Sequence, residues 1–189
     1  MTWYKAIIGV LVLLIIGSMQ ETHNLQNMYM QDIKLSYNAG VMHGVQKAID
    51  DKQSSVEIIT IVFSKYPKCV NPRQEAEWVV EYATKYEVPP VILALMICQE
   101  SSCNPEALSS CGARGLTQIR WKYWGDMLKK VGIANKESDL NNRRISIQAG
   151  AYILRYLLDK YDQSLEKAFE HFSGSANHYM EKVIRRVKI

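Results

Sequence analysis

The chain opens with an uncharged apolar run, AIIGVLVLLIIG, at residues 6–17, and this run constrains where everything after it can fold. It has no polar face, which distinguishes it from an ordinary core helix and predicts a membrane segment. As a helix it spans about 18 Å of a bilayer core of about 30 Å, so flanking residues such as Trp3, Tyr4 and Ser18 must extend it if it crosses. We predict a transmembrane anchor helix over residues 1–20.

The charge beside this run predicts its orientation. Lys5 precedes the run, so the positive-inside rule leaves the N-terminus in the cytoplasm and the residues after Gln20 outside. A cleaved signal peptide is the alternative, with Lys5 as its charged region, although no small-x-small cleavage site follows Gly17. We favour a retained inner-membrane anchor with the rest of the chain outside the cytoplasm, or association with a virion.

The 189 residues suffice for one ordinary domain plus an appendage. Residues 21–66 are expected to form a stalk and connecting segment. A narrow apolar stripe at helical spacing runs to about residue 51, and the segment VEIITIVF at residues 56–63 suits either a short strand or a buried helical turn. Residues 67–189 show helical patterns between short punctuated loops, which predicts an all-α domain. Its helices are expected at residues 71–86, 88–101, 121–131, 141–161, 164–172 and 176–187.

A carboxylate at the end of an apolar helix is the candidate for chemistry. Glu100 follows the segment VILALMIC, where the helix dipole and low polarity both oppose ionisation and raise the pKa of a carboxyl group. Such a group suits general acid catalysis near neutral pH, although a solvated helix-end glutamate is the ordinary alternative. No Asp or Glu occurs from residue 107 to residue 125, which disfavours a two-carboxylate glycosidase unless Asp126 or a more distant acid folds in.

The residues around Glu100 resemble the lytic transglycosylase family with the soluble-lytic-type, goose-lysozyme-like catalytic domain. The stretch ALMICQESSCNPEALSSCGARGLTQI is similar to the family signature ES-x-x-NP-x-A-x-S-x-x-GA-x-GLMQ. Downstream, QAGAYILRYLLDKYD and KAFEHFSGSANHYMEKV resemble two further segments of the family. The resemblance covers residues 67–189 and implies a lysozyme-like helical domain.

The resemblance also implies roles for the matching residues. Glu100 is the implied sole acid and base, and neither a cofactor nor a metal is implied. The implied substrate-binding residues are Ser101, Ser109, Gly115, Gln118, Tyr152 and Phe172, and Gly112 with Gly115 is expected to let the backbone approach the sugars. The implied reaction cleaves the bond between N-acetylmuramic acid and N-acetylglucosamine and closes a 1,6-anhydro ring, for which one carboxylate suffices.

Several positions depart from the family pattern. Phe172-Ser173 stand where the family has Tyr-Asn, which removes a phenolic hydroxyl that usually reaches the catalytic glutamate. Thr117 replaces the usual Met, and Arg120 stands where an apolar residue is common. These departures bear on rate and on saccharide register.

Four cysteines allow three pairings. Cys103 and Cys111 flank a seven-residue loop, and after export a disulfide between them would staple the groove wall, so we favour this pair. Cys98 is expected to pair with Cys69 or to remain a buried thiol. No His lies at ligand spacing from any of them, so no zinc site is expected.

Three functions are consistent with these patterns. The favoured one is a membrane-anchored lytic transglycosylase that opens peptidoglycan for a phage entry, conjugation or secretion machine. A hydrolytic muramidase on the same fold and a non-catalytic glycan-binding subunit are the alternatives. The expected partners are glycan strands, the membrane and a larger assembly. The net charge of +4 is too small for a nucleic-acid-binding footprint.

Overall fold

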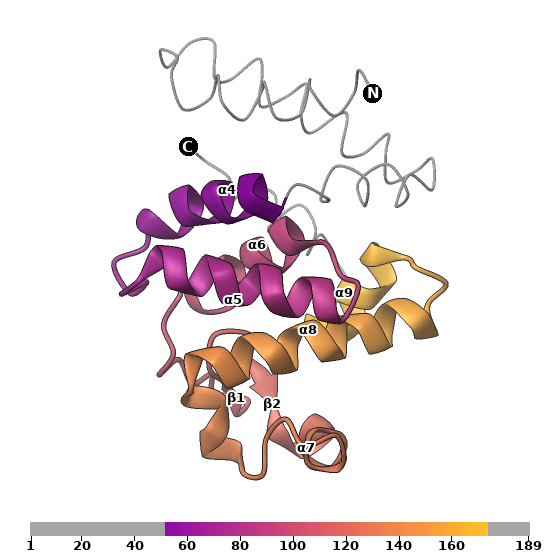
Figure 1. Cartoon of the computed structure of the whole chain (residues 1–189). Helices are drawn as coiled ribbons and strands as arrows, with labels where there is room; N and C mark the ends of the chain where they lie inside the picture. Colours follow the sequence, from indigo (N-terminus) through magenta and orange to yellow (C-terminus); the bar gives the residue numbers. More distant parts are fainter. Residues whose placement is uncertain (1–51, 174–189) are drawn as a thin grey trace. The chain divides into compact units, whose positions relative to one another are not determined.

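A computed structural model of the chain describes residues 52–173 (Figure 1). The predicted anchor over 1–20, the stalk as far as residue 51 and the predicted helix at 176–187 lie outside these residues. No helix within residues 52–173 is long and apolar enough to cross a membrane. Apart from one short hairpin, the regular structure of this part is helical, which confirms the predicted all-α class.

Helix α4 (Lys52–Ser64) decides between the two predictions for residues 56–63, because the segment is helical. Its β-branched residues suit a strand, but Val56, Ile59 and Phe63 recur at helical spacing and are all buried in the core. This helix packs against α5 (Pro72–Lys85). Helix α4 therefore belongs to the core of the domain, although its residues lie within the segment that we assigned to the stalk and connecting segment.

Helices α5 and α6 (Pro90–Ser101) begin where their caps and prolines predict. The Asn71 side chain accepts a hydrogen bond from the Gln74 N–H at 3.3 Å, and Pro72 occupies the first turn of α5. Every residue of α6 from Leu93 to Cys98 is buried, and α6 contacts α4, α5 and α8 (Arg143–Lys160). A helix without a polar face must be covered on all sides, and α6 is accordingly the centre of the core.

The remaining elements follow α6 in the chain. Strand β1 (Ala113–Arg114) pairs antiparallel with β2 (Ile119–Arg120), with Ala113 opposite Arg120 and Arg114 opposite Ile119. The hairpin leads into α7 (Trp121–Lys130), a short 3-10 helix η1 (Glu137–Asn141), α8 and α9 (Leu165–Ser173). Helix α8 lies alongside α5, with the hairpin and α7 on its other side (Figure 1). The helices predicted at 121–131, 141–161 and 164–172 are confirmed.

Candidate active site

Glu100 lies in the last turn of α6 and is partly exposed, while the preceding residues from Leu93 to Cys98 are buried. The helix ends directly after it. The Ser102 N–H donates to the Cys98 carbonyl at 3.1 Å, and Ser102 and Cys103 have left-handed φ angles of 51° and 62°. Because the chain reverses here, Glu100 stands at the boundary between the apolar core and the loop of residues 102–118.

Tight hydrogen bonds within this loop give it a defined shape. The Ser109 N–H donates to the Ala113 carbonyl, and the Ala113 N–H donates to Ser109 Oγ, both at 2.9 Å. The Gln118 side chain donates from Nε2 to the carbonyls of Ala107 and Gly115, each at 3.0 Å. The Ser101 hydroxyl donates to the Ile97 carbonyl at 3.1 Å. Three residues that we expected to bind substrate thus also hold the loop or the helix end in place.

The outer side of the loop is fastened to η1. Arg114 donates from Nε to the Glu137 carboxylate at 3.4 Å and from Nη1 to Asn141 at 3.3 Å. The Asn141 side chain in turn donates to the Glu106 carboxylate at 2.6 Å. These contacts join residues more than twenty positions apart, so η1 holds the outer side of the loop in place.

The inner side of the loop is packed on α8. Thr117, which replaces the family's usual Met, is fully buried and donates from Oγ1 to the Ser146 carbonyl at 2.9 Å. A side chain at Gly150 would meet Thr117 Cγ2 at 2.5 Å. The departure at position 117 is therefore part of the contact between the loop and α8.

Gly115 has a packing role in the structure, and its predicted contact with substrate stays a prediction. A Cβ at this position would lie 2.0 Å from the Leu140 carbonyl oxygen and 2.9 Å from Ser146 Oγ. Its φ of +79° also favours glycine. Gly115 lets the loop approach η1 and α8 closely. A Cβ at Gly112 would have no neighbouring atom within 4 Å, so glycine is needed there only for its φ of +77°.

Replacing Gly115 with Ala is expected to lower the free energy of unfolding by about 2–4 kcal/mol, from the left-handed backbone and the overlap with Leu140 together. Gly112→Ala is the matched control, because it has the same backbone strain without the overlap, and it should cost about 1–2 kcal/mol. Urea denaturation of both variants measures the difference. Equal losses would contradict the close packing of the loop on η1.

Tyr152 lies on α8, where it contacts the end of α5. Helix α8 runs beside α5, and the end near Arg143 lies at the end of α6, where Arg143 donates to the Cys103 carbonyl at 3.4 Å. Tyr152 lies nine residues after Arg143 on α8, which is about 13 Å along the helix axis. There it packs edge-on against Tyr86 at the end of α5, with ring centroids 5.5 Å apart. Tyr152 therefore packs between α5 and α8, and its substrate role stays a prediction.

Phe172 is buried on α9 together with Ala168 and Phe169, and α9 packs against α8. The position that usually carries a phenolic hydroxyl is thus a core position in this chain. Ser173, the second departure, is the last residue of α9.

The structure contains no disulfide between Cys103 and Cys111. All four cysteines are free in the structure, Cys111 is exposed, and Cys103 is fully buried. The Cys103 thiol contacts the thiols of Cys69 and Cys98, and these contacts, with burial, raise its pKa. The left-handed turn at Ser102 and Cys103 directs the chain so that Cys103 enters the core.

A buried ion pair next to Cys69 and Cys103 was not predicted from the sequence. Glu75 is 2% exposed, and Arg143 Nη1 contacts both of its carboxylate oxygens at 2.8 Å. Arg143 also donates to the carbonyls of Lys68 and Cys103. Burial raises the pKa of Glu75, and Arg143 opposes the shift. The available signal was a carboxylate on the apolar face of α5, one turn before Val79.

All four carboxylates between Glu100 and α8 have partners. Glu106 accepts from Asn141, and Glu137 pairs with Arg114. Asp126, the nearest candidate for a second acid, is fully exposed on α7 at 3.7 Å from Lys129 Nζ. Asp139 accepts from the N–H groups of Asn135 and Lys136. The loop side of the site therefore offers Glu100 no unpaired second carboxylate.

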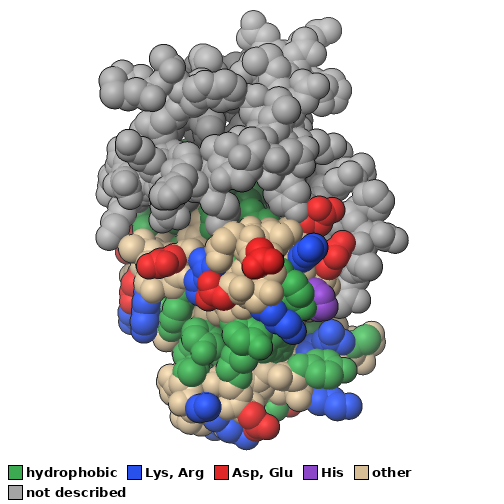
Figure 2. Space-filling model, turned by 90° about the vertical axis from the view of Figure 1, so that its right-hand side faces the viewer, with side chains coloured by type: hydrophobic (Ala, Val, Ile, Leu, Met, Phe, Trp, Pro, Cys, Tyr) green, Lys and Arg blue, Asp and Glu red, His purple; other side chains and the backbone are tan. Residues whose placement is uncertain are grey.

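Exposed aromatic side chains on α7 and α8 form a feature that the sequence motifs did not predict. Figure 2 shows hydrophobic side chains gathered in a band on one face, with charged side chains beside it. Tyr123 and Tyr156 are 62% and 40% exposed, and Trp124 meets Tyr156 edge-on at 5.9 Å. Arg120 lies over the Tyr123 ring, 4.7 Å from its centroid. Exposed rings of this kind offer flat apolar surface together with polar edges.

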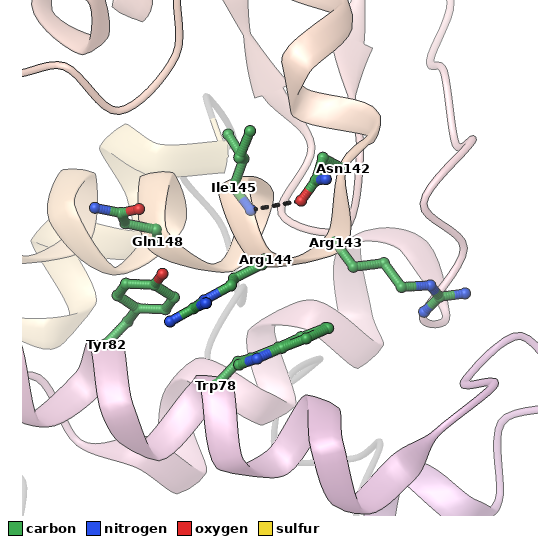
Figure 3. Close-up of a pocket in the computed structure, with 7 residues that line it drawn as sticks. All are labelled: Trp78, Tyr82, Asn142, Arg143, Arg144, Ile145 and Gln148. Atoms are coloured by element: carbon green, nitrogen blue, oxygen red, sulfur yellow. Dashed lines mark hydrogen bonds between the residues drawn. The ribbon is translucent and has the colours of Figure 1, made fainter.

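A separate hollow of about 610 Å³ lies between α5 and α8 (Figure 3). It is lined by Trp78, Tyr82, Asn142, Arg143, Arg144, Ile145 and Gln148. Arg144 lies 5.7 Å from the centroid of the Tyr82 ring and pairs with Glu81 at 2.8 Å. None of the predicted substrate-binding residues lines this hollow, and Arg143 connects its edge to the loop through the Cys103 carbonyl.

Comparison with known families tests the resemblance around Glu100. The sequence model of the transglycosylase SLT domain matches residues 77–183, more than half of the chain. The chain belongs to the transglycosylase SLT domain family. The match includes Glu100, the whole loop, η1 and α8. The helical domain is accordingly of the lysozyme-like class, as predicted.

Membership in the SLT family supports the general activity at the level of the family. Its domain acts on peptidoglycan as a lytic transglycosylase, so peptidoglycan is the substrate class of this chain. The part of the match beyond residue 173 lies outside the described residues, as does the segment SANHYMEKV, which we compared with the family's last motif.

Proposed function

We propose that Glu100 is the single acid and base in cleavage of the bond between N-acetylmuramic acid and N-acetylglucosamine. The Glu100 carboxyl protonates the glycosidic oxygen that leaves with N-acetylglucosamine. The resulting carboxylate takes the proton of the muramic C6 hydroxyl, whose oxygen attacks C1 and closes the 1,6-anhydro ring. Glu100 is protonated again at the end, and no water is consumed.

One observation supports this reaction more than any other. Glu100 lies at the end of a buried apolar helix, and all four carboxylates between it and α8 have partners. Hydrolysis by inversion or by a covalent intermediate requires a second carboxylate across the scissile bond. The one-carboxylate route requires none.

Reducing ends provide the test. An anhydro product has no reducing end, whereas a muramidase creates one with each cut. Digestion of purified sacculi with the full chain is expected to release soluble muropeptides without a rise in reducing ends. One new reducing end per released fragment would favour the muramidase alternative, and no release at all would favour a non-catalytic glycan-binding subunit.

We further propose that the chain is held at the inner membrane, with the SLT domain outside the cytoplasm, and opens peptidoglycan for a phage entry, conjugation or secretion machine. The support is the apolar run at residues 6–17 with Lys5 before it. Membrane fractionation tests this placement. The full chain should pellet with membranes, and a chain that begins at Lys52 should not; equal fractionation would contradict the anchor.

A further inference from the structure

Three of the four cysteines meet in the core near the end of α6. Cys98 and Cys103 are fully buried, and Cys69 is 7% exposed. They come from the segment before α5, from α6 itself and from the turn after it. The Cys103 thiol lies in hydrogen-bonding contact with the thiols of both Cys69 and Cys98. Cys103 is therefore the shared neighbour in this group, which we call the thiol cluster.

The backbone on both sides of the thiol cluster is held independently of the sulfur atoms. Arg143 donates to the carbonyl of Lys68, next to Cys69, and to the carbonyl of Cys103 at 3.4 Å. Glu75, the ion-pair partner of Arg143, also hydrogen-bonds with Cys69. One buried ion pair thus keeps Cys69 and Cys103 together before any bond forms between them.

The thiol cluster does not have the arrangement of a metal centre. Within residues 52–173, no group of three or more His, Cys, Asp or Glu side chains is placed to hold a metal ion. The chemistry open to closely packed thiols is then oxidation to a disulfide.

We propose that Cys69 and Cys103 form a disulfide when the protein meets a disulfide-bearing oxidant, and that Cys98 remains a thiol. Cys69 is the member of the cluster with exposed surface, so it reacts first. Its thiolate attacks one sulfur of the oxidant and releases one thiol. The Cys103 sulfur then attacks the Cys69 sulfur, and the Cys103 proton passes to the leaving sulfur, which departs as the second thiol. Two protein thiols are thus oxidised and one oxidant disulfide is reduced.

This bond joins the segment before α5 to a residue three positions after Glu100. It goes beyond the proposed function and does not depend on it, since the bond forms whether or not the chain cleaves glycans. It closes a loop of about 35 residues, and the loss of unfolded-chain entropy is expected to raise the thermal midpoint by about 10 °C.

The test starts from the full chain, purified with reductant and then equilibrated with oxidised glutathione. The protein is quenched with acid, alkylated in denaturant and mapped as peptides without reduction. We expect one disulfide, between Cys69 and Cys103, with Cys98 and Cys111 alkylated. A bond from Cys103 to Cys98 or to Cys111, or alkylation of all four, would overturn the proposal.

Cysteine variants provide a second measurement that separates the bond from general stability. For each variant the thermal midpoint is compared with and without reductant. Cys69→Ala and Cys103→Ala should lose the difference of about 10 °C, while Cys98→Ala and the exposed control Cys111→Ser should keep it. A difference that survives in Cys69→Ala, or disappears in Cys111→Ser, would contradict the assignment.

Discussion

Replacing Glu100 with Gln is expected to reduce muropeptide release from purified sacculi by about 10²- to 10⁴-fold. The amide keeps the shape of the side chain but can neither deliver nor accept the proton that both steps of the reaction require. Because Glu100 is partly exposed at the end of α6, the change should leave the fold intact. Clearance of sacculus turbidity measures the rate, and circular dichroism checks the helical content.

Glu77→Gln is the matched control for this variant. Glu77 is an exposed glutamate on α5 that pairs with Arg73 at 3.5 Å and accepts a hydrogen bond from Gln74, both on the same helix. Its amide variant should clear sacculi at the parent rate. If Glu100→Gln also clears them at a rate near that of the parent, Glu100 is not the acid.

Replacing Arg143 with Met is expected to lower the free energy of unfolding by about 3–5 kcal/mol. The substitution leaves the buried Glu75 carboxylate without its cation and removes the hydrogen bonds to the carbonyls of Lys68 and Cys103. Leaving one buried charge without its partner costs more folding free energy than the intact ion pair contributes. Urea denaturation of the two proteins measures the loss.

Two further variants make this result specific. Arg144→Met breaks an exposed pair with Glu81 and should cost no more than about 1 kcal/mol. The double variant with Glu75→Gln and Arg143→Met removes the stranded charge and should recover part of the stability that Arg143→Met alone loses. A loss for Arg143→Met as small as that for Arg144→Met would contradict the buried ion pair.

Glu75 also predicts a dependence of stability on pH. Burial raises its pKa in the folded chain, so protonation favours the folded state. This contribution is complete below the unfolded-state pKa of about 4.3 and is lost as the pH rises through the folded-state pKa. The side chain in the Glu75→Gln variant does not titrate. As the pH rises over that interval, the unfolding free energy of the parent should therefore fall relative to that of the variant. A difference that does not change with pH would contradict the shift.

The helices of the domain were predictable because local signals mark their ends. Asn71 with Pro72 begins α5, the prolines after Val88 begin α6, and Asn142 caps α8 by accepting from the Ile145 N–H at 3.1 Å. The position of Glu100 followed from its motif and from the apolar run before it. Each of these signals lies within a few residues of the feature that it predicts.

The features that sequence reasoning missed or left open depend on contacts between distant segments. Residues 56–63 are helical because α5 and α6 cover one face of α4, which overrides their β-branched composition. Tyr152 faces Tyr86 because α8 lies alongside α5, and no motif specifies that register. Cys103 meets Cys69 instead of Cys111 because the turn after α6 leads it into the core. Cysteine spacing alone does not contain this information.

Product mass after digestion in water labelled with heavy oxygen tests the central claim most directly. If Glu100 closes an anhydro ring, the released muropeptides are lighter by one water molecule than the corresponding hydrolysis products and contain no heavy oxygen at the muramic end. If the chain is a hydrolase, every new end carries one heavy oxygen atom and the full mass of the added water. We expect the first result for the full chain, and the second would contradict the one-carboxylate reaction.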